Sequence, residues 1–110
     1  MQIYKTPLKE FKFLIDDFLK LHESDFLKNQ ELETSDLMLI LDEAAKLCEE
    51  TLLPLNQSGD SEGCKFDNGN VSAPKGFKDA YKLFAENGWQ GLKVKEEFGG
   101  QNLPYIMNML

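Results

Sequence analysis

The segment from Asp36 to Leu53 constrains the fold most, because its apolar residues recur with the period of an α-helix. At about 100° per residue, one broad arc of such a helix carries most of the apolar side chains. These are Leu37, Ile40, Leu41, Ala44, Ala45, Leu47, Cys48 and Leu52. The opposite arc carries Asp42, Glu43, Lys46, Glu49 and Glu50, together with two misplaced leucines, Leu39 and Leu53. The pattern predicts a long amphipathic helix with one face in a core.

Local signals set the expected ends of this helix. Thr34 and Ser35 offer N-cap hydroxyls, and Asp36 is an acid in the first turn, where the helix dipole favours it. Pro54 has no backbone N–H and crowds the preceding turn, so we expect the helix to end or kink there. The stretch 56–63 is rich in turn-forming residues and is expected to be a loop.

Two further amphipathic segments predict helices on either side of the long one. Thr6-Pro7 is typical of a helix start, and residues 8–21 place apolar side chains on one face, with Phe13 among the charges. Pro74 is expected to open a later helix that carries Phe77, Ala80, Tyr81 and Phe84 on one face and ends at Asn87-Gly88.

The intervening segments are short and polar. Residues 22–33 predict a connection that can contain a short helical turn, and Asn68-Gly69 predicts a tight hairpin turn with short arms. Residues 90–98 are expected to be extended or loop, and Pro104 to start a fourth helix. The fold class predicted is therefore all-α, with one short hairpin-like turn.

Composition limits the functional classes. A length of 110 residues with 42% hydrophobic content fits one small domain with a packed core. The net charge of -7 argues against binding to nucleic acid or to an anionic membrane. The longest purely apolar run, residues 37–41, is too short to span a bilayer, and residues 1–7 do not resemble a secretion signal. We therefore expect a cytoplasmic setting and two free cysteines.

Residues that could carry chemistry are few and isolated. His22 beside Glu23 could be a general base, but no nucleophile accompanies it in the sequence, and a solvated residue is the simpler interpretation. Cys48 and Cys64 have neither CxxC spacing nor histidine partners, which argues against a metal or redox site. Cys48 is better explained as a small apolar residue on the packed helix face.

Three other patterns resemble ligand-binding or catalytic motifs but lack features that those motifs require. Asp60, Glu62 and Asp67 surround a glycine as in a calcium loop, but Cys64-Lys65-Phe66 interrupts the alternating ligand pattern. Gly99-Gly100 matches neither GxGxxG nor a P-loop and is explained by a sharp turn. The acidic pairs Asp16-Asp17, Glu49-Glu50 and Glu96-Glu97 are sequence neighbours, which point apart on a helix and make poor acid–base dyads. We predict no catalytic, cofactor-binding or metal-binding residue in this chain.

One set of motifs suggests a family. The run Gly88-Trp89-Gln90-Gly91-Leu92 is followed by Glu96-Glu97-Phe98-Gly99-Gly100-Gln101-Asn102-Leu103-Pro104. Together they resemble a stretch of the N-terminal domain of acyl-CoA dehydrogenases. Upstream residues resemble a branch of that family with an extended N-terminus, which includes enzymes similar to 3-methylmercaptopropionyl-CoA dehydrogenase. They are Tyr4, Pro7, Leu8, Phe13-Leu14, Leu52-Leu53-Pro54-Leu55-Asn56, Gly59-Asp60, Glu62-Gly63-Cys64 and Phe66-Asp67-Asn68-Gly69.

The resemblance implies a division of the chain and a partial role in an enzyme. It implies an extension with one amphipathic helix over residues 1–33, and an incomplete N-terminal helical domain over residues 34–110. Complete family members bind FAD, oxidise an acyl-CoA thioester at its α,β carbons and pass electrons to an electron-transferring flavoprotein. They are usually homo-oligomers. Neither their flavin-contacting motifs nor their catalytic glutamate can be carried onto any position here.

Two functional hypotheses follow from these features. The first is an N-terminal portion of an FAD-dependent acyl-CoA dehydrogenase that needs the remaining domains of the enzyme and is inactive by itself. Phe13, Leu39 and Leu53 project from polar arcs, as expected if a second surface is covered by more protein. The alternative is a free-standing helical interaction module that binds a partner without catalysis.

Overall fold

The longest element of the molecule is a helix that runs from Thr34 to Glu62 in the computed structural model, which describes residues 2–110. It consists of α3 (Thr34–Lys46), a π-helical turn η3 (Leu47–Leu52) and α4 (Leu53–Glu62). The prediction that this helix ends at Pro54 and gives way to a loop is therefore wrong, because helical structure continues to Glu62. The wide turn η3 lies directly before the proline, and π-turns accommodate a ring that crowds preceding carbonyls and supplies no N–H.

The long helix also begins earlier than predicted. Its N-cap is Glu33, not Thr34 or Ser35, and the Glu33 N–H donates a 2.9 Å hydrogen bond to Asp36 Oδ2. This bond is half of a capping box, in which a side chain three residues into the helix binds the cap backbone. A glutamate at the cap position was not foreseen because hydroxyl residues directly follow it in sequence.

The N-terminal part of the chain contains two short helices joined by short turns. Helix α1 (Leu8–Phe13) passes into a π-helical turn η1 (Leu14–Phe18), and the segment ends before Lys20, whose φ of 48° is left-handed. The predicted helix over 8–21 is thus confirmed in place but is shorter. Pro7, rather than Thr6, is the N-cap residue. The connection contains a 3₁₀ turn η2 (Leu21–Glu23) and a short helix α2 (Asp25–Asn29).

The C-terminal half follows the predicted order. Strands β1 (Lys65–Asp67) and β2 (Asn70–Ser72) pair antiparallel, with Phe66 opposite Val71, around Asn68 and Gly69, which have φ of 47° and 81°. The predicted hairpin is confirmed. Helix α5 (Phe77–Glu86) starts after Gly76 rather than at Pro74, and Gly88 follows its end with a φ of 76°. Two 3₁₀ turns, η4 (Trp89–Gly91) and η5 (Glu96–Phe98), and a short α6 (Ile106–Met109) complete the chain.

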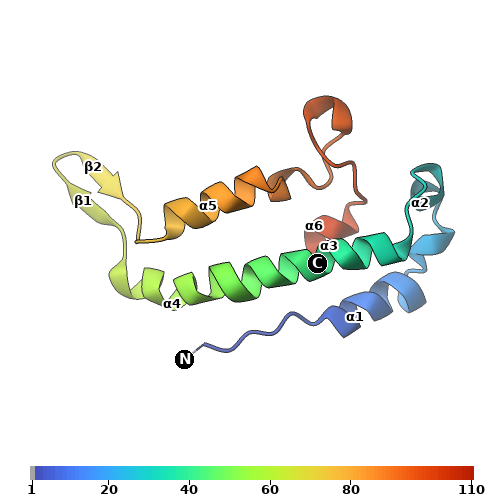
Figure 1. Cartoon of the computed structure of the whole chain (residues 1–110), viewed down its shortest axis with the longest axis horizontal. Coiled ribbons are helices and arrows are strands. Elements are labelled where there is room, and N and C mark those ends of the chain that lie inside the picture. The colour runs from blue at the N-terminus through green and yellow to red at the C-terminus, as the bar shows by residue number, and fades with distance from the viewer. Residues whose placement is uncertain (1) are drawn as a thin grey trace.

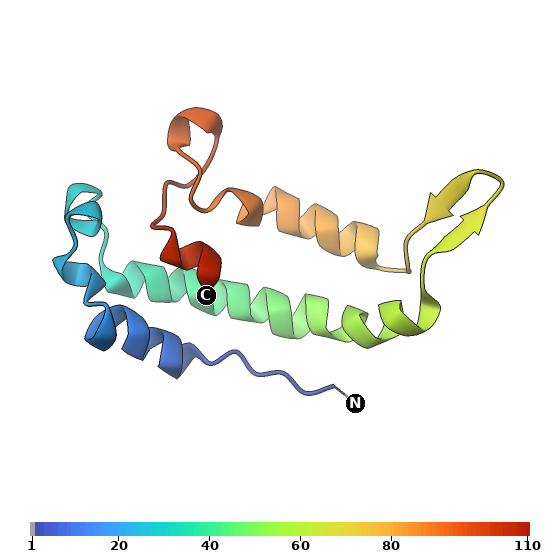
Figure 2. The same cartoon turned by 180° about the vertical axis from the view of Figure 1, so that it is seen from behind.

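These elements lie side by side in a single layer. The chain runs back and forth, so that α1 lies along one side of the long helix and α5 lies along the other (Figures 1 and 2). The Cα positions extend over 56 × 36 × 15 Å, and the radius of gyration is 17.2 Å. A compact chain of this length has a radius of gyration of about 13 Å. Domains normally need two packed layers to bury their apolar faces, so this layer leaves both broad faces open.

The buried core lies at one end of the layer. It joins residues of η1, α2, α3, α6 and the loop after α5, namely Ile15, Leu27, Leu37, Leu41, Leu92, Leu103 and Met107. Outside it, Phe13 is 55% exposed and Leu39 is 68% exposed, as their places on polar arcs predicted. Leu53 is half-buried. The all-α prediction with one short hairpin is confirmed.

Candidate functional site

The histidine and cysteine candidates lie apart from one another in the fold. His22 Nε2 lies 3.7 Å from Glu23 Oε1, and both side chains are more than half exposed. Cys48 is half-buried on the long helix, whereas Cys64 is exposed just before β1, and both are free thiols. In the part of the chain that the structure describes, His22 is therefore not placed as a base for either cysteine.

The acidic candidates are also separated. Asp60 and Glu62 belong to the last turn of α4, whereas Asp67 lies at the end of β1, so they do not form one calcium loop. Over residues 2–110 the structure contains no cluster of three or more histidine, cysteine, aspartate or glutamate side chains able to hold a metal ion. Glu96 and Glu97 lie on the exposed turn η5.

The glycine-rich stretch after α5 folds back on itself. Leu103 N–H donates to Leu92 O at 2.8 Å, and Gln101 N–H donates to Gly91 O at 3.0 Å. A Cβ on Gly100 would lie 2.1 Å from Val94 O, so only glycine fits there. Leu92 and Leu103 reach the buried core. These residues therefore position two core leucines, and their backbone groups are used within the loop.

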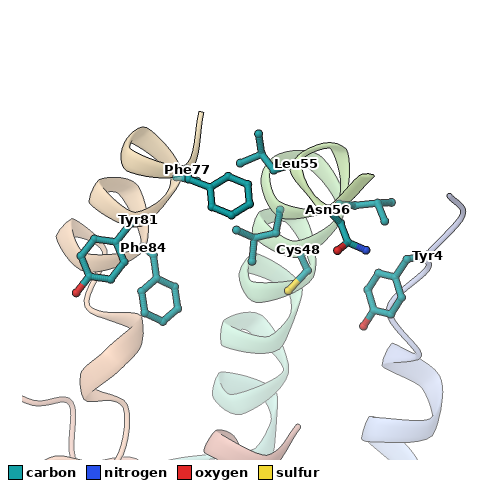
Figure 3. A pocket seen from close by; sticks show the side chains of 10 residues that line it. Tyr4, Cys48, Leu55, Asn56, Phe77, Tyr81 and Phe84 are labelled. Atoms are coloured by element: carbon teal, nitrogen blue, oxygen red, sulfur yellow. The ribbon is translucent and has the colours of Figure 1, made fainter. Parts of the chain in front are cut away.

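An apolar concavity lies at the other end of the layer. It is a groove of about 480 Å³ whose floor is the long helix, with α5 on one side and the N-terminal segment on the other (Figure 3). The groove is lined by Tyr4, Cys48, Leu52, Leu53, Leu55, Asn56, Phe77, Ala80, Tyr81 and Phe84. Concave apolar sites with few polar groups are where proteins bind ligands or other protein segments.

Close packing at two glycines brings α5 to the groove. A Cβ on Gly59 would lie 2.4 Å from Phe77 Cζ, so the absence of a side chain in α4 admits the phenylalanine ring. Gly76, with a φ of 89°, allows the chain to turn into α5 and lies against Leu55. Tyr81 is nevertheless 73% exposed and Phe77 is 38% exposed. The aromatic side chains of α5 are thus held beside α4, but part of their surface remains exposed to solvent.

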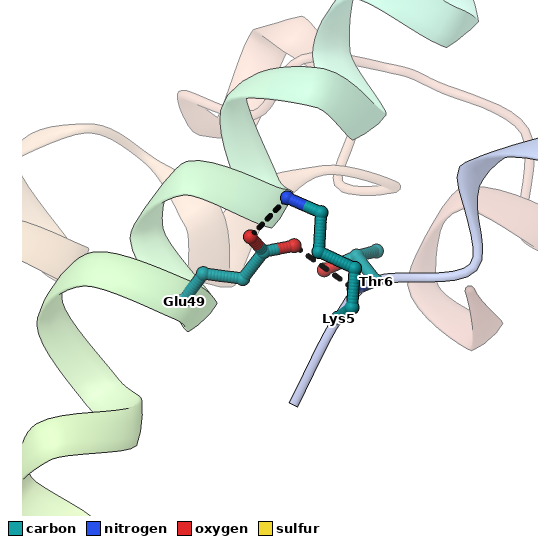
Figure 4. A network of polar contacts seen from close by, with 3 residues as sticks. All are labelled: Lys5, Thr6 and Glu49. Carbon is teal, nitrogen blue, oxygen red and sulfur yellow. Dashed lines mark hydrogen bonds and ion pairs between the residues drawn. The ribbon is translucent and has the colours of Figure 1, made fainter. Parts of the chain in front are cut away.

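A carboxylate fixes the opposite side of the groove. Glu49 Oε2 accepts a hydrogen bond from Lys5 Nζ at 2.7 Å, and Glu49 Oε1 accepts one from the Thr6 N–H at 2.9 Å (Figure 4). The hydrogen bond from Lys5 and then that from the Thr6 backbone lower the pKa of Glu49 to about 2. The same contact raises the pKa of Lys5. Both groups are therefore charged at neutral pH.

The comparisons with known proteins decide the family. Residues 34–110 match the family model described as the N-terminal domain of acyl-CoA dehydrogenase. The chain belongs to the acyl-CoA dehydrogenase family. The resemblance inferred from the glycine-rich motifs is thereby confirmed.

Two curated proteins are similar to this chain over most of its length. The chain is 34% identical over 105 residues to 3-methylmercaptopropionyl-CoA dehydrogenase from Ruegeria pomeroyi, covering 94% of this chain and 18% of that protein. It is 33% identical over 91 residues to butyryl-CoA dehydrogenase from Syntrophomonas wolfei, covering 77% of this chain and 15% of that protein. The chain thus spans less than a fifth of the length of either relative.

The groove does not fit the cofactor associated with acyl-CoA dehydrogenases. FAD carries a diphosphate, which requires cationic side chains or a free helix start. The lining of the groove includes no cationic residue, and Asn56 supplies its only amide side chain. In the glycine-rich loop, the N–H groups of Gly99, Gly100, Gln101, Asn102 and Leu103 donate to carbonyl groups of the same loop.

Among residues 2–110, no helix is both long enough and apolar enough to cross a lipid bilayer.

Sequence reasoning did not find the groove or its carboxylate anchor. The helical spacing of Phe77, Tyr81 and Phe84 marked the aromatic face, but the apolar residues around Pro54 were assigned to a helix end. Lys5 and Glu49 are 44 residues apart, and nothing in their local sequence distinguishes them from the other surface charges. The glycine-rich motif, which identified the family, lies at the packed end of the structure and not in the groove.

Proposed function

We propose that this chain forms the N-terminal portion of an FAD-dependent acyl-CoA dehydrogenase and supports catalysis there by packing. The observation that carries this proposal is the apolar groove left open on a single-layer member of the family. Partly exposed aromatic and aliphatic side chains gain free energy when more protein covers them. In the complete enzyme this portion would help to wall the acyl-CoA site and hold the flavin domain in place.

The chemistry is assigned to the complete enzyme rather than to these residues. The proposed reaction is α,β-dehydrogenation of an acyl-CoA thioester with FAD as hydride acceptor, after which electrons leave to an electron-transferring flavoprotein. None of His22, Cys48 or Cys64 has the partners that a base, nucleophile or metal ligand needs, which supports this division of labour. We also propose that the complete enzyme is a homo-oligomer and that it lies in the cytoplasm.

The proposed division of the chain follows from the same reasoning. Residues 1–33 are proposed to be an N-terminal extension that contributes α1 and α2, and residues 34–110 to be part of the family's helical domain. The start of the family match at residue 34 supports that boundary. Because Ile15 and Leu27 are fully buried in the shared core, the extension would be an integral part of the fold rather than a loose tail.

A direct assay separates a supporting role from a catalytic one. The purified 110-residue chain is incubated with FAD, passed through a desalting column, and then given butyryl-CoA and an electron-accepting dye. We expect no retained flavin absorbance and no dye reduction dependent on acyl-CoA. Retained flavin together with turnover would overturn the assignment of chemistry to other parts of the enzyme.

The nucleotide sequence beyond the Leu110 codon tests the same proposal without purification. An open reading frame that continues into a β-strand-rich segment supports an enzyme portion. A stop codon directly after Leu110, combined with a cooperative melt and a defined monomer or dimer in solution, would contradict it. That result would support a free-standing interaction module that uses the groove to bind a partner.

A further inference from the structure

Residues 2–7 lie along the long helix without secondary structure of their own (Figure 1). Anchors hold this segment on both sides of Tyr4. On one side, Asn56 Nδ2 donates a 2.9 Å hydrogen bond to Gln2 Oε1. On the other side, Lys5 Nζ and Thr6 N–H donate to the two oxygens of Glu49 at 2.7 and 2.9 Å. The side chain of Tyr4 is therefore placed by contacts made by its neighbours.

Tyr4 forms the side of the groove that faces away from α5. Figure 3 shows it across the long helix from Phe77 and Phe84, with the sulfur of Cys48 on the same side of the helix as the tyrosine ring. Tyr4 and Cys48 both line the groove, and Cys48 is half-buried whereas Tyr4 is 45% exposed. The groove loses this wall if residues 2–7 leave the helix.

We propose that residues 2–7 act as a strap that Glu49 holds against the long helix, and that the held strap closes the Cys48 side of the groove. The proposal uses contacts within this chain and is independent of the enzymatic role proposed above. Release of the strap opens the groove on that side and exposes the Cys48 thiol. The strap is thus a conformational device that sets how open the groove is.

Glu49 is the decisive anchor for chemical reasons. It uses both carboxylate oxygens and receives one bond from a charged group and one from the backbone, and charge-assisted bonds are stronger than neutral ones. The Gln2–Asn56 bond joins two neutral, exposed side chains. Glu50, the next residue, is exposed and makes no hydrogen bond to residues 2–7, although its charge acts on Lys5. Glu50→Ala is therefore a control for the loss of a carboxylate that is not hydrogen-bonded to the strap.

The first readout is hydrogen exchange of the Thr6 amide, measured by NMR on the full 110-residue chain. In Glu49→Ala the exchange rate is expected to rise roughly threefold to tenfold, in line with loss of a partly exposed charged contact. In Glu50→Ala it should stay at the wild-type rate. Equal Thr6 exchange in both variants and in the wild type would overturn the role of Glu49. Should Glu49→Ala lose helical circular dichroism, Glu49→Met, which also removes both acceptor oxygens, takes its place.

The second readout is the alkylation rate of Cys48 by iodoacetamide, with Cys64 as an internal reference in the same molecule. Mass spectrometry of the digested chain separates the two sites. The ratio of the Cys48 rate to the Cys64 rate is expected to rise roughly threefold in Glu49→Ala and in Tyr4→Ala. It should be unchanged in Glu50→Ala. The double variant Tyr4→Ala/Glu49→Ala should show no higher ratio than either single variant, because both substitutions remove the same side of the groove.

The two readouts together decide between distinct outcomes. Faster Thr6 exchange with a higher Cys48 ratio in Glu49→Ala supports the strap and its closing action. Faster Thr6 exchange with an unchanged Cys48 ratio would overturn the closing action, because the strap would then be released without opening the groove. A rise in the Cys48 ratio in Glu50→Ala equal to that in Glu49→Ala would also contradict the proposal.

Discussion

The two ends of the layer differ in how far their apolar residues are buried. At the packed end, seven residues from η1, α2, α3, α6 and the loop after α5 form a buried cluster that includes Ile15, Leu27 and Leu37. At the open end, α4 and α5 align leucines and aromatics along a groove that stays accessible. The same helix supplies both ends. The difference shows that helical periodicity reports which face is apolar and does not report whether this chain covers it.

The number of surrounding elements explains the contrast. Along α3 the long helix has α1 on one side and α6 close to it, whereas farther along it has α5 on one side and, of residues 2–110, only the segment 2–7 on the other (Figures 1 and 2). A helix buries its apolar stripe only against other packed elements. The open end is therefore the part that gains most from contact with further protein.

The largest expected effect is a cavity at the packed end. Leu37 is fully buried, so Leu37→Ala should reduce the free energy of unfolding by about 2–5 kcal/mol. Leu39→Ala, on the same helix but with 68% of Leu39 exposed, should change it by less than about 0.5 kcal/mol. Urea denaturation of the two variants measures the difference. Equal losses would mean that the packed end is not a true core.

The next largest effect is expected in the glycine-rich loop. A Cβ on Gly100 would lie 2.1 Å from Val94 O, a backbone atom that cannot rotate away, so Gly100→Ala should cost about 1–3 kcal/mol. Gly99→Ala is the matched control. No atom lies within 4 Å of its Cβ position, and its φ of 82° alone should cost about 1 kcal/mol. A greater loss in Gly99→Ala would contradict the tight loop closure.

A smaller effect is expected from the corresponding change at the open end. A Cβ on Gly59 would lie 2.4 Å from Phe77 Cζ, but the phenylalanine ring is partly exposed and can swing outward. Alanine also favours the helix by about 1 kcal/mol over glycine, so the net change in unfolding free energy should be within about 1 kcal/mol. The Phe77 ring resonances should shift clearly, with Ser61→Ala as control. A loss as large as that of Gly100→Ala would show a tightly packed open end.

The smallest expected effect depends on pH. The pKa of Glu49 falls from 4.5 to about 2 on folding, so its contribution is fully present above about 4.5 and is lost as the pH falls through about 2. The difference in melting temperature between the wild type and Glu49→Ala should therefore shrink between pH 5 and pH 2.5. Glu50→Ala should show no such trend. A constant difference across this range would contradict the ion pair with Lys5.

Much of the fold was predictable because local signals specify it. The helical faces of Leu37–Leu41 and Phe77–Phe84, the Asn68-Gly69 turn and the left-handed Gly88 all appear where short-range physics places them. Pro54 misled the prediction because a π-helical turn resolves its clash, and that turn has no clear sequence signal. The rule that proline ends a helix therefore gave the wrong boundary, because a π-helical turn allowed the helix to continue.

The candidate site was less predictable than the fold. The groove requires α5 to lie beside α4, which depends on the fit of Phe77 over Gly59, two residues 18 positions apart. The strap requires Lys5 to meet Glu49 across 44 residues. Neither pairing follows from periodicity or capping. The family motif, in contrast, was recognisable because it is continuous in sequence.

Native-state hydrogen exchange of the 110-residue chain tests the contrast between the two ends most directly. Amides of residues 37–45 should exchange only through global unfolding, because they lie next to the buried cluster. Amides of residues 80–86 in α5 should exchange through local opening at rates at least tenfold faster. Equal, globally limited protection of both segments would contradict the claim that the open end is less stable than the packed end.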